Sequence, residues 1–260
     1  METVIIDYAN VDSEKICCCT SDKKCVKAKK DWLINTFEDG LIYRKGNVNG
    51  KVFVEYIPAE DAWCPVEADG YMFIHCLWVA GKYQSEGNAK MLLRETIAEA
   101  KIKQKKGLVI LSSAQKKPYL ADKKFLEHMG FQSADTTAPY FELMYLPFAK
   151  EAPPPKFMSH AKEGKTQEAG WVLYHSEQCP FTAKYVPIAK ETAKECGIDL
   201  TTIRLHIPRD KQGLEQIPDT IRPQECPSPF TAYALYHNGV FVTHEIQTAK
   251  KLKALFEKDN

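Results

Sequence analysis

The chain has 260 residues, of which 44% are hydrophobic, so its apolar side chains suffice for one large core or two ordinary ones. Its 35 Lys and Arg residues balance 34 Asp and Glu residues, which excludes the strongly basic surface of a general binder of nucleic acid or anionic membranes. No apolar stretch reaches the roughly 18 residues of a membrane helix, and the N-terminus lacks a basic segment followed by a long apolar one, so we expect a soluble, cytoplasmic protein.

Four of the nine cysteines lie close together near the N-terminus: Cys17, Cys18, Cys19 and Cys25. An odd number of cysteines in a chain of this size favours reduced thiols over a disulfide framework. Adjacent side chains diverge on a regular backbone, and the tract has neither a Cys-x-x-Cys pair nor a nearby histidine. We therefore expect these thiols to pack a helix or line a pocket, and we expect no metal site.

Strand and helix patterns follow in turn. Residues 41–58 contain two β-rich runs around the turn sequence GNVNG, as in a hairpin. Residues 71–79 and 107–113 are almost wholly apolar, as in central strands covered on both faces. Residues 87–103, between them, carry apolar side chains at helical spacing. A short helix and a last strand, both within residues 121–146, complete the pattern of a mixed α/β sheet.

The clearest domain boundary lies in residues 147–170, where three consecutive prolines precede a polar, Gly-containing stretch. Such a segment is typical of a linker that is semi-rigid at the prolines and looser after them. The chain is therefore divided into a first domain of residues 1–148, a linker of residues 149–168 and a second domain of residues 169–260.

The second domain shows a similar alternation of elements. Residues 170–198 indicate a strand, a Cys-containing turn and a helix, and residues 199–207 indicate a second strand. Residues 228–246 then indicate a hairpin with HNG as its turn. This order predicts a smaller α/β domain.

The sequence KYQSEGNAKMLL, residues 82–93, lies where the apolar strand of the first domain ends and the helix begins. Backbone N–H groups at a helix N-terminus can bind an anion, and Gly87 permits close approach of the backbone. The loop has neither the G-x-G-x-x-G fingerprint of dinucleotide-binding proteins nor the G-x-x-x-x-G-K-[ST] sequence of P-loop proteins. Taken alone, the loop fits either another phosphate site or a simple helix cap.

The stretch QSEGNA, residues 84–89, resembles the Q/R-x-x-G-x-G/A loop of the GNAT superfamily of acyl-CoA-dependent N-acetyltransferases. It follows an apolar strand and opens an amphipathic helix, as in that family, and KKFLEHMGF and YFELMYL resemble the family's later helix and closing strand. The resemblance covers residues 1–148. It implies a mixed-sheet α/β GNAT domain that uses acetyl-CoA as co-substrate and needs no metal.

The same resemblance implies where coenzyme A binds. The loop amides hold the pyrophosphate, and the preceding strand, which family members splay away from its neighbour, pairs with the pantetheine arm. The chemistry then needs an oriented neutral amine, a stabilised oxyanion and proton transfer. The implied cofactor-binding residues are Leu77, Trp78, Val79, Gln84, Ser85, Glu86, Gly87, Asn88 and Ala89.

Two positions depart from the family pattern. Leu126 replaces a Tyr that many members use to protonate the leaving thiolate, and Phe73 replaces a strand Glu that many use as base. His75 shares a strand face with Phe73 and is the candidate base, directly or through water, although it could also be a packed strand histidine. Tyr119 and Tyr140 are the candidate acids. Other acidic candidates near the sheet are Glu55, Glu60 and Glu67.

The second domain resembles the thioredoxin and glutaredoxin fold. Cys179 lies where that family's nucleophilic Cys precedes the first helix, and Pro187 lies at the place of its helix-kinking proline. Thr182 replaces the second Cys of the C-x-x-C motif, which disfavours an ordinary dithiol oxidoreductase. The sequence CPFT could therefore mark a low-pKa thiol or an inherited turn inside a binding or substrate-positioning module.

Cys226 lies beside the loop that corresponds to the family's cis-proline, for which Pro229 or Pro227 is the candidate. In the thioredoxin fold this loop approaches the active Cys. Cys179 and Cys226 are thus candidate reactive thiols, and a disulfide between them is a hypothesis.

A GNAT domain joined to a thioredoxin-like domain resembles the YoaP-like group of bacterial acetyltransferases. We therefore expect an N-acetyltransferase that moves an acetyl group from acetyl-CoA directly to a primary amine of a small-molecule or peptide acceptor. Residues 17–37 would form part of the acceptor pocket, and the second domain would cover or extend it. The alternative is a thiol-based redox or regulatory protein that uses Cys179 and binds acyl-CoA without turnover. A third hypothesis is a non-catalytic module that binds a peptide along the sheet.

Overall fold

The structure is a computed structural model that describes residues 1–16, 18, 21–207 and 219–258. Its first half contains the strands β1 (Thr3–Ile6), β2 (Ile42–Gly46), β3 (Val52–Pro58), β4 (Val66–Glu67), β5 (Met72–Val79), β6 (Gly107–Ser113), β7 (Ala121–Asp122), β8 (Gln132–Thr137), β9 (Phe141–Pro147) and β10 (Lys156–Phe157). The helices of this half are α1 (Lys23–Phe37), α2 (Asn88–Ile102), α3 (Lys123–His128), α4 (Ser159–Glu163) and the short 3-10 helices η1 (Ala59–Asp61) and η2 (Gly81–Tyr83).

The second half has its own strands and helices. They are β11 (Trp171–His175), α5 (Thr182–Glu195), β12 (Leu200–Leu205), β13 (Thr220–Ile221), η4 (Pro223–Glu225), β14 (Tyr233–His237), β15 (Val240–Thr243) and α6 (Ala249–Phe256).

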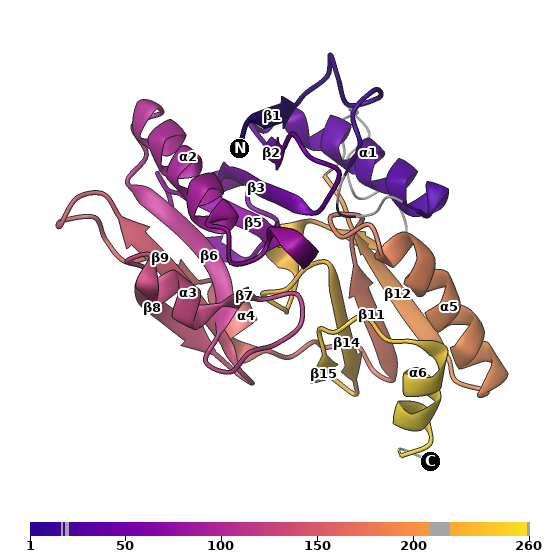
Figure 1. Ribbon diagram of the computed structural model, residues 1–260. Coiled ribbons are helices and arrows are strands. Elements are labelled where there is room, and N and C mark those ends of the chain that lie inside the picture. The colour runs from indigo at the N-terminus through magenta and orange to yellow at the C-terminus, as the bar shows by residue number, and fades with distance from the viewer. Residues whose placement is uncertain (17, 19–20, 208–218, 259–260) are drawn as a thin grey trace.

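Two sheets organise the molecule (Figure 1). The first has the strand order β1-β2-β3-β5-β6-β9-β8, with β7 beside β6, and the second has the order β13-β12-β11-β14-β15. The β5–β6 pair is parallel and the helix α2 connects its strands, whereas β2–β3, β3–β5 and β6–β9 are antiparallel. The predicted mixed α/β sheet and its hairpin are confirmed. The strands β1 and β8, which were not predicted separately, extend the sheet at its two ends.

Helices α2 and α3 cover one face of the first sheet (Figure 1). Leu92 and Leu93 of α2 and Leu126 of α3 are fully buried, and they share one apolar cluster with Val54 and Ile110 of the sheet. The helical spacing of apolar residues in α2 therefore describes the side of the helix that faces the strands.

Helix α1 and the second sheet cover the opposite face of the first sheet. Trp32 of α1 and Phe53 of β3 belong to one buried cluster with Val172 and Tyr174 of β11 and Tyr236 of β14. A single apolar core therefore runs from one half of the chain into the other.

The second sheet divides its side chains between two cores. Because successive strand residues point to opposite faces, Val172 and Tyr174 face the first sheet while Leu173 faces the other way, where α5 and α6 contribute Val186 and Leu252. The helices α5 and α6 thus lie on one face of this sheet only (Figure 1). Pro187 lies inside α5 as expected, and Asn238 and Gly239 form the expected turn between β14 and β15, both with positive φ.

The expectation of a loose linker after the prolines is wrong. Strand β10 pairs antiparallel with β4, with Phe157 opposite Val66, and α4 follows directly. Lys165 then forms a bridge with Val240 of the second half. Phe157 is almost fully buried, so this connection is fastened to both halves by backbone hydrogen bonds and by an apolar anchor that the proline-rich composition concealed.

The expectation of a cis-proline at Pro227 or Pro229 is also wrong. Neither residue follows a cis peptide bond, and the cis bond in the described part of the chain joins Ala138 to Pro139 in the first half.

The shared core predicts that the two halves unfold together. Leu205 of β12 is fully buried in the cluster between the sheets, so Leu205→Ala should lower the free energy of unfolding by about 2 to 5 kcal/mol. Urea denaturation should show one transition in both proteins. Thr201→Ala, on an exposed position of the same strand, should change stability by less than about 0.5 kcal/mol. Separate transitions for the two halves would contradict the shared core.

Candidate functional site

The strands β5 and β6 part from one another halfway along β5. Their parallel pairing runs from Met72 opposite Leu108 to Ile74 opposite Ile110 and stops there. Beyond this point β5 stays paired with β3, and β6 stays paired with β9. The second half of β5 therefore has a backbone edge that pairs with no strand of the described chain on the β6 side, as the resemblance implied for this strand. We call the region over which β5 and β6 are not paired with each other the opening.

A β-bulge lies at the point where the strands part. Glu55 of β3 is opposite Cys76 and the next residue, Tyr56, is opposite Ile74, so His75 is an extra residue without a partner on β3. A bulge disrupts the ladder locally and increases the twist of the strand. The residues from Cys76 to Val79 are half-buried, in contrast to the buried start of β5, and His75 exposes only backbone, because its side chain is fully buried.

The loop after β5 leads directly from this opening to the start of α2. Its shape is fixed from within, because the Gln84 side-chain amide donates to the Val79 carbonyl at 3.0 Å and the Asn88 amide donates to the Tyr83 carbonyl at 2.8 Å. The residues from Gln84 to Gly87 between these braces are exposed. The loop is therefore ordered and accessible.

The N-terminus of α2 is suited to an anion. Gly87 is its N-cap residue, has φ of 79° and offers no side chain to the first-turn N–H groups. A Cβ at this glycine would meet no atom within 4 Å, so the space in front of these N–H groups is open. Uncapped amides and the positive end of the helix dipole favour negative charge at this position.

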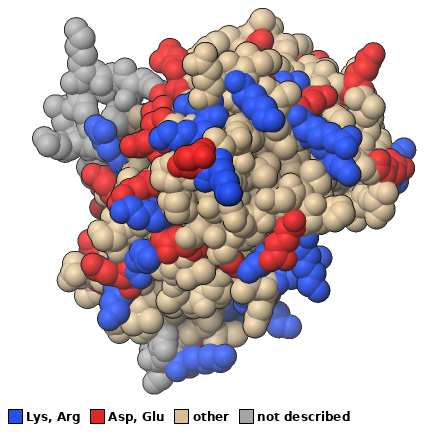
Figure 2. All heavy atoms as spheres, turned by 90° about the vertical axis from the view of Figure 1, so that its left-hand side faces the viewer, with Lys and Arg blue, Asp and Glu red and all other residues tan. Residues whose placement is uncertain are grey.

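The predicted cofactor residues lie along one continuous path. Leu77, Trp78 and Val79 form the end of β5, and residues 84–89 form the loop and the first turn of α2. Asn88 differs from the others, because it is buried and its side chain braces the loop. Figure 2 looks onto the side that carries α2 and β8 and shows acidic and basic side chains interspersed there, in keeping with the balanced charge of the chain.

His75 does not fit the predicted role of general base. Its side chain is fully buried, and its Nε2 accepts a hydrogen bond from the Trp63 backbone N–H at 2.9 Å. Burial, with a smaller contribution from the charge of Lys29, lowers the pKa of His75 to about 3. The ring is therefore neutral near neutral pH, and its accepting nitrogen is already occupied.

A buried ion pair that the sequence analysis missed lies beside His75. Lys29 Nζ is 2.5 Å from Glu55 Oε2, and both side chains are almost fully buried. The same ammonium donates to the Gln178 carbonyl of the second half at 2.6 Å and lies 4.0 Å from the Trp32 ring centroid. Helical spacing could have predicted the burial of Lys29, because this residue lies on the same face of α1 as the other buried residues. These are Cys25, Trp32, Leu33 and Thr36.

The two candidate acids have different surroundings. Tyr140 directs its hydroxyl to His244 Nδ1 of the second half at 2.6 Å, and because His244 Nε2 contacts the Pro118 carbonyl, the tyrosine is the donor. This hydroxyl fastens the two halves together, which does not fit a catalytic acid. Tyr119 is 47% exposed and follows β6 in the chain. Burial, then the neighbouring Cys179, raises the pKa of Tyr119 to about 12, so it keeps its proton.

The positions that depart from the family pattern belong to the cores. Leu126, where many relatives have a Tyr, is fully buried under the sheet, and Phe73, where many have a Glu, is almost fully buried on the opposite face. Of the other acidic candidates, Glu55 is paired with Lys29, Glu60 accepts from the Gly70 N–H and contacts Lys105, and Glu67 contacts Lys156. Their partners are thus within the protein.

The predicted reactive thiols are not joined by a disulfide. Cys226 is fully buried, and burial raises its pKa to about 12, so it does not fit a reactive thiol. Burial is the main cause of the raised pKa of Cys64, and Cys226 contributes to it. Burial is likewise the main cause of the raised pKa values of Cys76 on β5 and of Tyr119, to which Cys179 contributes. Cys179 is half-buried and precedes α5, and the Thr182 hydroxyl donates to its carbonyl at 2.7 Å. The residue before Cys179 contacts α1, because the Gln178 carbonyl accepts from Lys29.

The N-terminal thiols show no metal site in the described part of the chain. No group of three His, Cys, Asp or Glu side chains suited to a metal occurs among those residues. Cys18 and Cys25 are buried, and Cys17 and Cys19 lie outside the described residues. No helix in the same described part is long and apolar enough to cross a membrane.

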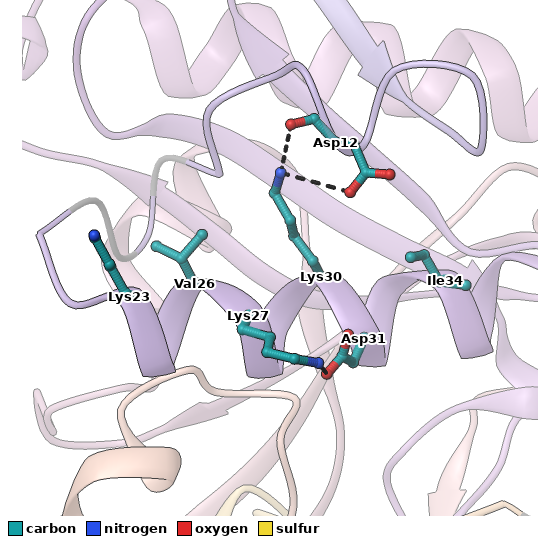
Figure 3. Close-up of a pocket in the computed structure, with 7 residues that line it drawn as sticks. All are labelled: Asp12, Lys23, Val26, Lys27, Lys30, Asp31 and Ile34. Carbon is teal, nitrogen blue, oxygen red and sulfur yellow. Dashed lines mark hydrogen bonds and ion pairs between the residues drawn. The ribbon is translucent and has the colours of Figure 1, made fainter.

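Two hollows lie beside α1 and away from the loop. The larger, of about 470 Å³, is formed by the outer face of α1 and the preceding segment, and Lys30 and Lys27 are already bonded there to Asp12 and Asp31 (Figure 3). A smaller hollow of about 170 Å³ lies between α1 and the second half, where Trp63 and Arg204 contribute to its wall. Neither hollow is lined by the predicted cofactor residues.

Comparison with known proteins gives matches to sequences and to structures. A family profile described as YoaP-like matches residues 216–253. The uncharacterized N-acetyltransferase YoaP of Bacillus subtilis is 36% identical over 249 residues, which cover 95% of this chain and 94% of that protein. A GNAT-family acetyltransferase from Brucella melitensis in complex with acetyl-CoA is 16% identical, with 61% of this chain and 97% of that chain covered and a TM-score of 0.38. A ribosomal-protein-alanine N-acetyltransferase from the same organism is 15% identical, with 61% and 100% covered and a TM-score of 0.41.

The buried, neutral His75 predicts sensitivity to acid. Its pKa falls from 6.5 in the unfolded chain to about 3 in the folded protein, so below pH 6.5 only the unfolded chain takes up the proton. The stability contribution is therefore complete above pH 6.5 and is lost progressively as the pH falls toward 3, by up to about 1.4 kcal/mol per pH unit.

His75→Gln should remove this part of the pH dependence in urea denaturation between about pH 7 and about pH 4. The exposed His128 provides the control, because His128→Gln should leave the slope of stability against pH unchanged. Equal slopes for the wild type and His75→Gln would contradict the assignment of a neutral His75.

Proposed function

The chain belongs to the YoaP family of N-acetyltransferases, and on this premise we propose that it moves an acetyl group from acetyl-CoA directly to a primary amine of a small-molecule or peptide acceptor. The observation that carries the proposal is the continuous path from the unpaired edge of β5 to the uncapped N-terminus of α2. Along this path, the backbone edge matches the amide-containing arm of coenzyme A, and the helix N-terminus that follows matches its pyrophosphate.

The residues of this path fit acetyl-CoA by their chemistry. The exposed loop from Gln84 to Gly87 and the first-turn N–H groups of α2 would hold the pyrophosphate, where Gly87 leaves the space open. The unpaired edge from Cys76 to Val79 would pair with the amides of the arm and direct an N–H group at the thioester carbonyl. When bound, acetyl-CoA supplies an activated acetyl group whose leaving group is a thiolate.

Tyr119 is the acid that the arrangement favours. It lies on the segment after β6, is partly exposed and keeps its proton because its pKa is raised to about 12. A protonated phenol can donate a hydrogen bond to the leaving sulfur as negative charge develops on it. Tyr140 is a poorer candidate, because its hydroxyl already donates a hydrogen bond to His244.

The second half supports the proposal as a thioredoxin-like unit on the acceptor side. The order β12-β11-β14-β15, with one parallel pair and two antiparallel pairs and with α5 and α6 on one face, is the arrangement that the resemblance implies. The turn that carries Gln178 and Cys179 faces α1 and β5, so it would form part of the acceptor pocket. We place the reaction in the cytoplasm, where thiols such as Cys179 stay reduced.

A second candidate function rests on Cys179. Its position beside Cys76 and Tyr119 favours a thiol-based regulatory role, in which the first half binds acyl-CoA without turnover. The two functions differ in whether an amine consumes the acetyl group.

The loop assignment predicts that Gly87→Asp weakens acetyl-CoA binding by at least about 100-fold, because the new carboxylate occupies the anion position and the residue needs positive φ. Calorimetry with the full chain measures the affinity. Gly197→Asp is the matched control, since Gly197 has φ of 68° and equally open surroundings but lies after α5. Equal affinities for Gly87→Asp and the wild type would refute the loop assignment.

The direct-transfer and thiol-based functions can be distinguished by measuring the release of coenzyme A thiol during turnover with a panel of amines. If acetyl transfer is direct, Cys179→Ser should keep kcat within about threefold of the wild type, because serine preserves the shape of the turn. Cys196→Ser, which changes another half-buried thiol of the second half, is the control. Loss of turnover in Cys179→Ser alone would favour the thiol-based function.

A further inference from the structure

His75, at the point where β5 and β6 part, has a hydrogen bond at one ring nitrogen and a carboxylate near the other. The Trp63 N–H donates to its Nε2, so the proton of the neutral ring is on Nδ1. Nδ1 lies 3.8 Å from Glu55 Oε1, a separation too long for a hydrogen bond, and neither of these buried atoms has a hydrogen-bond partner in the described part of the chain. The ring N–H and the Glu55 carboxylate are therefore a donor and an acceptor that are both buried, near one another and not hydrogen-bonded.

The apolar surroundings restrict the ring further. The His75 ring centroid lies 5.4 Å from that of Phe73 and 6.0 Å from that of Trp32. Phe73 belongs to the last part of β5 that is paired with β6, and Trp32 belongs to α1. The side chain is thus packed between the sheet and the helix that covers it, and it has little freedom to change its rotamer.

The carboxylate that faces His75 is fixed as well. Glu55 is held by Lys29, and Lys29 is in turn held by the Gln178 carbonyl. Burial raises the pKa of Glu55, whereas the charge of Lys29 lowers it, so the ammonium favours the ionised carboxylate. A chain of contacts therefore runs from the second half, through Lys29 and Glu55, to the bulge in β5.

We propose that His75 is a positioning residue: its ring, which accepts from the Trp63 amide and is packed against Phe73 and Trp32 beside Glu55, fixes the bulge at which β5 leaves β6 and so keeps the coenzyme A edge of β5 unpaired. The inference rests on the proposed function for its link to coenzyme A. It differs from general-base catalysis, because His75 acts through the backbone of Cys76 and the residues that follow, without touching the reacting atoms.

The geometry explains why a side chain is needed at this point. His75 has no backbone partner on β3, and the β6 pairing ends one residue before it. A bulged residue without a fixed side chain can be absorbed by a shift in register, which would bring β5 and β6 together and close the opening. The Trp63 bond and the Glu55 contact oppose this shift.

The test compares His75→Phe, which keeps a ring but loses both polar contacts, with His75→Gln, whose carbonyl can accept from the Trp63 N–H. Calorimetry with acetyl-CoA should show at least about fivefold weaker binding for His75→Phe and no more than about threefold for His75→Gln. The kcat of His75→Gln should stay within about threefold of the wild type. His244→Phe, which changes another buried histidine, should leave the affinity for acetyl-CoA unchanged.

A second readout does not depend on coenzyme A. Hydrogen exchange of the β5 amides should be faster in His75→Phe than in the wild type and nearly normal in His75→Gln. If His75→Phe does not fold, His75→Asn, too short to reach the Trp63 amide, should show the same faster exchange.

Normal exchange and normal binding in His75→Phe, or in His75→Asn where the former does not fold, would overturn the inference. So would His75→Gln that binds acetyl-CoA normally and has no turnover, since that result identifies a base. Failure of the wild type to bind acetyl-CoA would refute the proposed function alone, and the exchange data would still decide the role of His75.

Discussion

The parting of β5 from β6 after Ile74 is the constraint on which the site depends. Two parallel neighbours can separate only if each keeps a partner on its other side, and β3 and β9 provide those partners. The bulge at His75 supplies the extra residue that lets β5 turn away without losing β3. The loop that follows then reaches the N-terminus of α2 at the end of the exposed edge, so the unpaired edge and the proposed anion site follow one another along the chain.

The second sheet is part of the same folded core as the first. It covers the face of the first sheet that α1 leaves open, and the apolar cluster between the sheets includes residues from both halves. Polar contacts cross the same interface, where Lys29 reaches the Gln178 carbonyl and Tyr140 reaches His244. Removal of the second half would therefore expose apolar surface and leave a buried ammonium without one of its acceptors, which is costly. The second half is therefore part of the core of the first, and in the proposed function it would also form a wall of the site.

The sequence predicted those elements whose pattern is local. The apolar runs that became β5 and β6, the helical spacing of α2 and the turn at Asn238 are set by neighbouring residues. The role of His75 was missed because it depends on Trp63 and Glu55, which meet it only in the folded chain. The linker was misread because three prolines suggest an exposed connection, whereas Phe157 anchors it through contacts distant in sequence. Patterns of period two or 3.6 contain no information about such pairings.

The placement of the ionisable groups limits how the acceptor amine can lose its proton. His75 is neutral and occupied, Glu55 is paired with Lys29, and the usual base position is the buried Phe73. Tyr119 keeps its proton at neutral pH, so it can donate a hydrogen bond to the leaving sulfur and is unsuited to take a proton from an ammonium. A lysine-like amine, with a pKa of about 10.4, would then arrive mostly charged, whereas an α-amino group, with a pKa of about 8, would arrive partly neutral. In the proposed reaction, an acceptor of the second kind would need less help from a base, which none of these residues supplies.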